Sequence, residues 1–224
     1  MIFLFDVDGT LTPPRREMTP SMAEVFEKIV NKNKVFLASG SDLIKIKQQV
    51  PAALLSKCEG VFSCAANVYH RGESLQYSKQ FIPQEALVME LKKILENSPY
   101  PHRTSTHIEY RPGMINFSII GRDATTEERE AYFKWDEKKQ ERKRMAVWLM
   151  ALFPELDIKI GGQISIDIYP KGFDKSQAVR LLHEEFPDES IWFFGDRTDE
   201  YGNDFSAVEE LHERDTAFPV RNSV

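Results

Sequence analysis

The first part of the chain alternates short apolar runs with amphipathic segments. Ile2–Phe5, Val35–Ala38 and Gly60–Phe62 are apolar runs of strand length. Between them, one segment opens at Thr19-Pro20 and another follows Asp42, and both carry apolar residues at helical spacing. This order of strand, helix, strand and helix predicts a parallel sheet with right-handed crossover connections.

The middle of the chain has a different pattern, in which paired strands are separated by short turns. Pro112-Gly113 and Gly161-Gly162 each join two β-like segments, and the second pair is a hairpin signal. Thr125 and Glu128 form a predicted capping box at the start of a charged helix. The remaining predicted elements are a helix over Leu87–Leu95, strands over 107–111, 114–120, 157–160 and 163–169, and a helix over 141–153.

The parallel pattern then resumes, with a helix predicted over Asp174–Phe186 and a strand over Ser190–Phe194. We therefore expect an α/β protein with a core domain formed by residues 1–76 and 173–224. Residues 77–172 are expected to form an inserted α+β domain with an antiparallel sheet.

Composition narrows the class of protein only slightly. The 224 residues are 42% hydrophobic and 29% charged, as in an ordinary globular protein, and the net charge of −6 disfavours a nucleic-acid partner. No apolar stretch is long enough to span a membrane, and the start of the chain lacks the basic segment of a signal peptide. Cys58 and Cys64 favour a reduced, cytoplasmic setting, with a disulfide between them as the alternative.

The strongest chemical signal is the carboxylate pair Asp6 and Asp8, directly after the first predicted strand. Residues two apart on a strand face the same way, so both carboxylates can enter one site. One can attack phosphorus and the other can act as general acid and base, with Mg²⁺ offsetting their repulsion. The alternatives are a solvated turn or a calcium loop, but Leu11–Pro14 lacks the further ligands of an EF-hand.

Three polar positions fall at the C-terminal ends of predicted parallel strands: Asp6, Ser39 and Asp196. Ligands bind at these ends in open α/β sheets, so we expect one shared site. Ser39 or Ser41 would donate to a phosphate, and the alternative for either serine is a helix N-cap. Lys175, which opens a predicted helix, is either a solvated lysine or the partner of an anion.

The resemblance is carried by an ordered set of motifs: Asp6-x-Asp8-Gly9-Thr10, the Ser39/Ser41 turn, Lys175, and Gly195-Asp196 with Asn203-Asp204. Together they resemble the haloacid dehalogenase (HAD) superfamily of phosphotransferases. Across nearly the whole chain, the resemblance narrows to the eukaryotic-type phosphomannomutase family, whose core carries a C2B-type cap. The segments that carry it are DVDGTLTPPR (6–15), RPGMIN (111–116), Gly121-Arg122, Glu128-Arg129, GGQISID (161–167), PKGFDK (170–175) and FFGDRT (193–198).

The resemblance implies specific roles at the core site. Asp6 would be the nucleophile, Asp8 the general acid/base, and Lys175 a stabiliser of phosphate charge together with Ser39 or Ser41. Mg²⁺ would be held by the Asp6 carboxylate, the Asp8 main-chain carbonyl and Asp196. The residues that match the family's substrate-binding positions are Arg15, Arg111, Asn116, Arg122, Arg129, Ser165 and Asp167. For any single arginine, the alternative is an ordinary surface charge.

The implied reaction interconverts mannose 6-phosphate and mannose 1-phosphate and feeds GDP-mannose synthesis. A hexose 1,6-bisphosphate would be both activator and intermediate. The alternatives are a sugar-phosphate phosphatase on the same fold and a non-enzymatic binding protein. Family members associate through their caps, so we expect a homodimer; the side chains of Leu87, Leu91, Leu149 and Leu152 form either the dimer face or the cap core.

The sequence departs from the family pattern at Ser63–Asn67, where the family usually has Glu-Asn-Gly. We expect an altered loop or altered cap movement there. The chain also ends at Val224, before a final helix found in the family.

Overall fold

The computed structural model describes residues 1–220, so the expectation about the chain end falls outside the described residues. The chain divides into two compact units. The core unit comprises Met1–Lys79 and the chain from Gly172 onward, and the inserted unit comprises Gln80–Lys171. The sequence predicts these boundaries after residues 76 and 172. Within residues 1–220, no helix combines the length and apolar character that crossing a bilayer requires.

The core unit is built on one seven-stranded sheet. Its strands are β1 (Ile2–Phe5), β2 (Lys34–Ala38), β3 (Gly60–Ser63), β4 (Val68–Arg71), β5 (Ser74–Ser78), β10 (Ile191–Gly195) and β11 (Thr216–Pro219). They lie in the order β11-β10-β1-β2-β3-β4-β5. The strands from β11 to β3 pair in parallel, as predicted for β1, β2, β3 and β10. The sequence pattern did not predict β11 or the antiparallel hairpin that β4 and β5 add.

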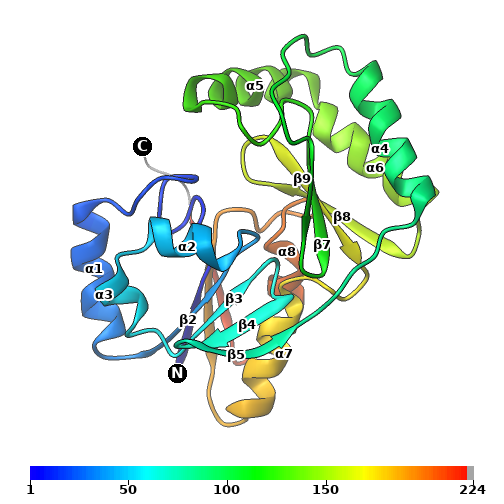
Figure 1. The fold of residues 1–224 in the computed structure, drawn as a ribbon. Helices are drawn as coiled ribbons and strands as arrows, with labels where there is room; N and C mark the ends of the chain where they lie inside the picture. The colour runs from blue at the N-terminus through cyan, green and yellow to red at the C-terminus, as the bar shows by residue number, and fades with distance from the viewer. Residues whose placement is uncertain (221–224) are drawn as a thin grey trace. The chain divides into compact units, whose positions relative to one another are not determined.

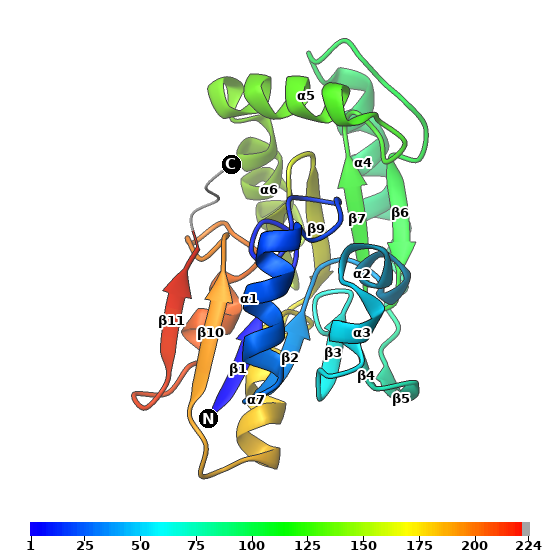
Figure 2. The same ribbon diagram turned by 90° about the vertical axis from the view of Figure 1, so that its left-hand side faces the viewer.

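Helices cover both faces of this sheet. They are α1 (Pro20–Val30), α2 (Leu43–Gln49), α3 (Ala52–Leu55), α7 (Ser176–Glu185) and α8 (Phe205–Glu209). Figures 1 and 2 show α1 and α3 on one face and α7 and α8 on the other. The alternation of the strands explains this arrangement, because Ile2 and Leu4 pack with the α7 side while Phe5 packs with the α1 side.

The inserted unit is an antiparallel sheet packed against helices. Its strands are β6 (Ile108–Arg111), β7 (Met114–Ser118), β8 (Leu156–Gly161) and β9 (Ser165–Pro170), in the order β6-β7-β9-β8. Its helices are α4 (Glu85–Asn97), α5 (Thr126–Lys139) and α6 (Glu141–Leu152). Helices α4 and α6 run along one face of the sheet (Figure 1), and the predicted capping box at Thr125 and Glu128 is present at the start of α5.

The leucines considered for a dimer face divide between core and surface. Leu87, Leu91 and Leu149 are buried in the apolar core of the inserted unit, so the alternative reading is correct for these three. Leu152 is exposed on α6. The difference follows from helical geometry, since Leu149 and Leu152 point about 60° apart on the same helix.

Candidate active site

Three carboxylates meet at the C-terminal edge of the core sheet. Asp6 directly follows β1, Asp196 directly follows β10, and Asp204 immediately precedes α8. Each offers a carboxylate oxygen, and these oxygens lie within 4.8 Å of one another. The expected meeting of Asp6 and Asp196 is therefore present, and Asp204 joins them.

Two glycines make room for this cluster. Gly9 has a φ of 95°, and a Cβ placed on it would lie 2.3 Å from Asp196 Oδ2. A Cβ on Gly195 would lie 2.6 Å from Asp204 Oδ2. Any side chain at these positions would displace a carboxylate, so both glycines are needed for the close approach.

Lys175 lies at the centre of the cluster. Its Nζ donates to Asp6 Oδ1 at 2.6 Å and to Asp204 Oδ1 at 2.5 Å, and the residue has no exposed surface. The solvated-lysine reading is therefore wrong, because a buried ammonium is held here by two carboxylates. Burial alone would lower the pKa of Lys175, but the charges of Asp204 and Asp6 outweigh it and raise the pKa above its ordinary value.

One ammonium among three carboxylates leaves an excess of negative charge. Burial, with the neighbouring charge of Asp204, raises the pKa of Asp196 to about 7. Burial also raises the pKa of Asp6, and Asp204 and Asp196 add to the effect, although Lys175 opposes it. Convergent, electron-rich carboxylate oxygens are the donors that Mg²⁺ prefers, so the residues present fit the expected cation.

We expect the stability of the metal-free protein to fall as pH rises. The folded-state pKa of Asp196, about 7, lies above the ordinary carboxyl value of 3.8. The stability that the protonated form contributes is therefore complete below the unfolded-state pKa and is lost as pH rises through the folded-state pKa. Between about pH 5.5 and about pH 8 the loss should be on the order of 2 kcal/mol. Thermal unfolding with and without Mg²⁺ measures this, and Mg²⁺ should stabilise more at the higher pH. A loss of the same size in Asp196→Asn would contradict the assignment.

Asp8 is held by three donors from three segments. Its Oδ1 accepts from the Arg15 main-chain N–H at 2.7 Å and from Gln49 Nε2 at 2.9 Å, and its Oδ2 accepts from Ser41 Oγ at 2.9 Å. Gln49 is buried and also donates to Thr12 Oγ1 at 3.0 Å. Together these contacts orient the carboxylate that the sequence assigns to proton transfer.

Neither serine is the N-cap of α2. The N-cap is Asp42, whose side chain accepts from the Lys45 N–H, so the capping alternative for Ser39 and Ser41 is wrong. Ser39 Oγ instead accepts from the Ser41 main-chain N–H at 3.0 Å. The turn therefore has its own internal hydrogen bond, and the Ser41 hydroxyl is directed to Asp8.

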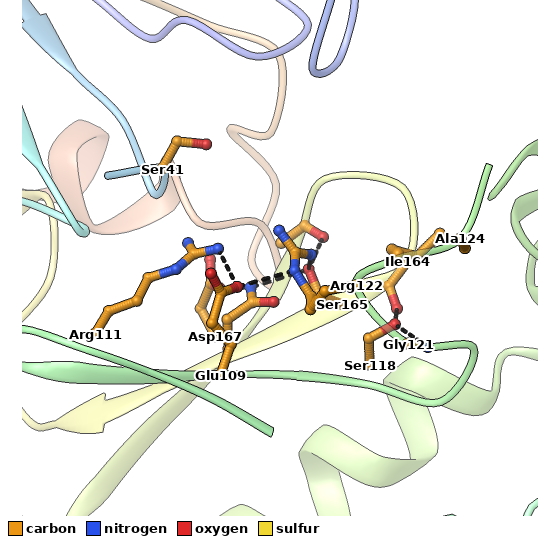
Figure 3. Close-up of polar contacts among 12 residues, drawn as sticks. Ser41, Glu109, Arg111, Ser118, Gly121, Arg122, Ala124, Ile164, Ser165 and Asp167 are labelled. Atoms are coloured by element: carbon orange, nitrogen blue, oxygen red, sulfur yellow. Dashed lines mark hydrogen bonds and ion pairs between the residues drawn. The ribbon is translucent and has the colours of Figure 1, made fainter. Parts of the chain in front are cut away.

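A second polar cluster lies on the sheet of the inserted unit. Glu109 and Arg111 project from the same face of β6, and Glu109 Oε2 lies 2.6 Å from Arg111 Nη2 and 2.9 Å from Arg122 Nε. Figure 3 shows Glu109 joining the two guanidinium groups. Arg111 and Arg122, both predicted to bind substrate, are therefore brought together by a carboxylate that the sequence reasoning missed.

Asn116, Ser165 and Asp167 also come together, because Asn116 on β7 is paired with Asp167 on β9. Asn116 Nδ2 donates to Asp167 Oδ1 at 2.6 Å and to Ser165 Oγ at 3.1 Å. Arg122 Nη1 reaches Ser165 Oγ at 3.5 Å, which links this group to the arginine cluster (Figure 3).

Arg129 and Arg15 are placed differently from the other predicted arginines. The guanidinium of Arg129 donates to the main-chain carbonyls of Ala124 and Arg122, so it braces the loop that carries Arg122. Arg15 has a φ of 60° and contributes its main-chain N–H to Asp8. Both residues therefore support neighbouring site residues through the backbone.

Comparisons with known proteins agree on one family. A family model described as eukaryotic phosphomannomutase matches residues 22–222. Curated phosphomannomutases from Dendrobium officinale and Nicotiana benthamiana are each 39% identical to the chain over 217 residues, covering 93% of this chain and 85% of theirs.

Solved structures support the fold. A sugar phosphatase of HAD subclass IIB aligns with a TM-score of 0.60 and 18% identity, covering 96% of this chain and 86% of its own. A haloacid dehalogenase-like hydrolase from Bacteroides thetaiotaomicron aligns with a TM-score of 0.58 and 14% identity, covering 96% and 93%. The fold is thus the HAD fold with a cap, and on the sequence matches the chain is an enzyme that belongs to the eukaryotic phosphomannomutase family.

Proposed function

We propose that this protein interconverts mannose 6-phosphate and mannose 1-phosphate through a phospho-aspartate at Asp6. The observation that carries the proposal is the cluster of Asp6, Lys175 and Asp204, all buried, with the partly exposed Asp196, in a chain of this family. A carboxylate beside an ammonium and a divalent-cation site is suited to attack on phosphorus.

In the first half-reaction, a carboxylate oxygen of Asp6 attacks one phosphorus of hexose 1,6-bisphosphate. The bond between that phosphorus and the sugar oxygen breaks, and Asp8 gives a proton to the leaving oxygen. In the second half-reaction, Asp8 takes a proton from the hydroxyl of a hexose monophosphate. That hydroxyl attacks the phospho-aspartate and regenerates the bisphosphate, so atoms and protons balance over the cycle.

The core residues hold and neutralise the transferred phosphoryl group. Lys175 and a hydroxyl from the Ser39–Ser41 turn would bind its oxygens. Asp6, Asp196 and the main-chain carbonyl of Asp8 would hold Mg²⁺. When bound, the cation supplies positive charge that offsets repulsion between the Asp6 carboxylate and a phosphate dianion.

The residues of the inserted unit would bind the rest of the substrate. Arg111 and Arg122 carry the planar donor forks that suit a second phosphate. Asn116, Ser165 and Asp167 form a hydrogen-bonded row that offers both donors and acceptors to sugar hydroxyls. Arg129, which braces the Arg122 loop, would act through that loop.

The same proposal includes a cytoplasmic homodimer that supplies mannose 1-phosphate for GDP-mannose. Cys58 and Cys64 are not joined by a disulfide, so the disulfide alternative is wrong. The proposal therefore keeps the reducing compartment expected from the sequence. The inserted unit exposes large apolar side chains on α4 and α6, which supports association through this unit. These side chains are Met89, Val147, Trp148 and Leu152.

Measuring both products separates this function from that of a sugar-phosphate phosphatase. We expect isomer formation that requires a catalytic amount of hexose 1,6-bisphosphate and Mg²⁺, with phosphate release below about a tenth of the isomer formed. Asp8→Ala should suppress both products while leaving the thermal unfolding transition in place. Steady phosphate release without isomer formation would instead identify a phosphatase, and no turnover with either product would favour a binding protein.

A further inference from the structure

Asn67 has a buried side-chain amide that forms hydrogen bonds to three other residues of the core unit. The residue has no exposed surface. Its Nδ2 donates at 2.8 Å to the carbonyl of Cys64 and at 2.8 Å to the carbonyl of Phe173, while its Oδ1 accepts from Gln177 Nε2 at 3.2 Å. A fully bonded buried amide of this kind fixes the segments that it joins relative to one another.

The first of these segments is an unusual turn. Cys64, Ala65 and Ala66 have φ values of 51°, 55° and 64°, three consecutive left-handed conformations without a glycine. The left-handed conformation is sterically unfavourable for every L-residue with a side chain, so the turn persists only because its surroundings hold it. The Asn67 side chain accounts for part of this support, because it bonds the carbonyl of Cys64.

The main-chain N–H groups of the same left-handed turn donate hydrogen bonds to the candidate phosphate-binding serines. The Cys64 N–H donates to the Ser41 carbonyl and the Ala65 N–H donates to the Ser39 carbonyl, both at 2.9 Å. The position of the Ser39–Ser41 turn therefore depends on the left-handed turn, and through it on Asn67.

Asn67 also contacts both segments that connect the core unit to the inserted unit. The main-chain carbonyl of Asn67 accepts from the N–H of Lys79, the last residue before the inserted unit, at 2.8 Å. Phe173 is the second residue of the core unit after the inserted unit ends at Lys171. Lys79 Nζ lies 4.5 Å from the centroid of the Phe173 ring and bonds Gln177 Oε1, so the two segments also hold each other.

We propose that Asn67 is a positioning residue for phosphoryl transfer, which couples the two connecting segments to the phosphate-binding turn and to Lys175. Lys175 lies two residues after Phe173 and two before Gln177, and Asn67 bonds both of these neighbours. Loss of these bonds lets the Lys175 segment and the Ser39–Ser41 turn move independently. This inference rests on the proposed mutase function only for its kinetic consequence.

That consequence is a change in the fate of the phospho-aspartate. Transfer to a sugar hydroxyl requires close alignment, and a displacement of about 1 Å can cost on the order of a hundredfold in rate. Attack by water tolerates misalignment better, because water is small and abundant. A loosened connection should therefore slow isomerisation more than hydrolysis.

Asn67→Asp tests the proposal, because the shape is kept but the two donated hydrogen bonds are lost. Asn33→Asp is the matched control, since Asn33 also donates its amide to one carbonyl, that of Ile29, in the same unit. Gln177→Met is a second variant in case Asn67→Asp does not fold. It removes the bond to Asn67 Oδ1, the contact with Lys79 and the bond that Gln177 Nε2 donates to the Asp174 carbonyl at 3.1 Å.

For Asn67→Asp we expect about a tenfold fall in kcat for isomerisation, less than about a twofold change in KM, and about a threefold rise in phosphate released per isomer formed. Gln177→Met should shift the same ratio in the same direction by less. Amide hydrogen exchange should be faster at Lys79 and around Phe173 to Gln177, and unchanged in the central strands β1 and β2.

Two results would overturn the inference. One is a wild-type ratio of phosphate to isomer in both variants, and the other is exchange that rises equally across the whole core unit, which would mark a purely structural residue. If the wild-type protein forms no isomer, the proposed function fails instead, and the exchange measurement still decides the role of Asn67.

Discussion

Replacing Asp6 with asparagine is expected to lower kcat for isomerisation by about 10⁵-fold or more, because the amide cannot form a phospho-aspartate. The fold should survive the change. Asp6 is buried and its pKa is raised, so removing its charge relieves repulsion with Asp196 and Asp204. Lys175 keeps its contact with Asp204 at 2.5 Å.

Intact-mass measurement after incubation with hexose 1,6-bisphosphate tests directly whether Asp6 becomes phosphorylated. The wild-type protein should gain one phosphoryl group and Asp6→Asn should gain none. Asp188→Asn, the same chemical change at an exposed turn position, should behave as the wild type. More than about 1% residual isomerisation in Asp6→Asn would show that another group is the nucleophile.

The part of the fold that the sequence predicts is the part that local periodicity controls. The apolar runs of β1 and β2 alternate between two buried faces, so their strands and the helices between them follow from the pattern alone. The hairpin of β4 and β5 was missed because Ser74–Ser78 is short and largely exposed. Leu75 and Tyr77 alternate with polar residues there, but Leu75 is itself exposed and marks no buried face. The position of β5 is determined by its pairing with β4, which in turn pairs with β3, so it depends on tertiary structure.

The same division applies to the candidate site. Asp6, Asp196 and Lys175 are marked by strand ends and by motif order, and the structure brings them together. Gln49 and Glu109 lie neither at a parallel strand end nor in one of these motifs. Gln49 is the last residue of an ordinary helix and reaches Asp8 only through the fold, whereas the i, i+2 spacing of Glu109 and Arg111 on a strand could have indicated a shared face.

The turn before Asn67 shows most clearly what could not be predicted from the sequence. From the sequence, the segment Ser63–Asn67 was expected to alter a loop or the movement of the cap. The three left-handed residues could not be anticipated, since Cys and Ala rarely adopt positive φ. The conformation is held by hydrogen bonds to the Ser39–Ser41 turn, which is distant in sequence, and by Asn67, whose side chain is itself fixed by the distant Phe173 and Gln177.

Lys175→Met is expected to have the second large effect, on stability as well as on rate. Methionine has a similar length and no charge, so the carboxylates of Asp6 and Asp204 would face each other without an ammonium between them. Breaking a buried ion pair in this way costs about 3–5 kcal/mol of unfolding free energy. Loss of a charge directed at the phosphoryl group should also lower kcat by at least about a hundredfold.

The stability loss should depend on pH and on the second carboxylate. The pKa values of Asp6 and Asp196 are both raised, so these acids lose their protons and repel each other more as pH rises. Without Mg²⁺ the stability loss should therefore be larger near about pH 8 than near about pH 5. The double variant Lys175→Met with Asp204→Asn should regain stability at pH 8 without regaining activity. Urea unfolding of the two variants measures this, and a double variant as unstable as the single one would mean that Lys175 stabilises the fold by packing rather than by charge. Recovered stability with no recovered turnover would show that unfolding does not cause the loss of turnover, because the fold would be intact while the Lys175 ammonium beside Asp6 is missing together with the Asp204 carboxylate.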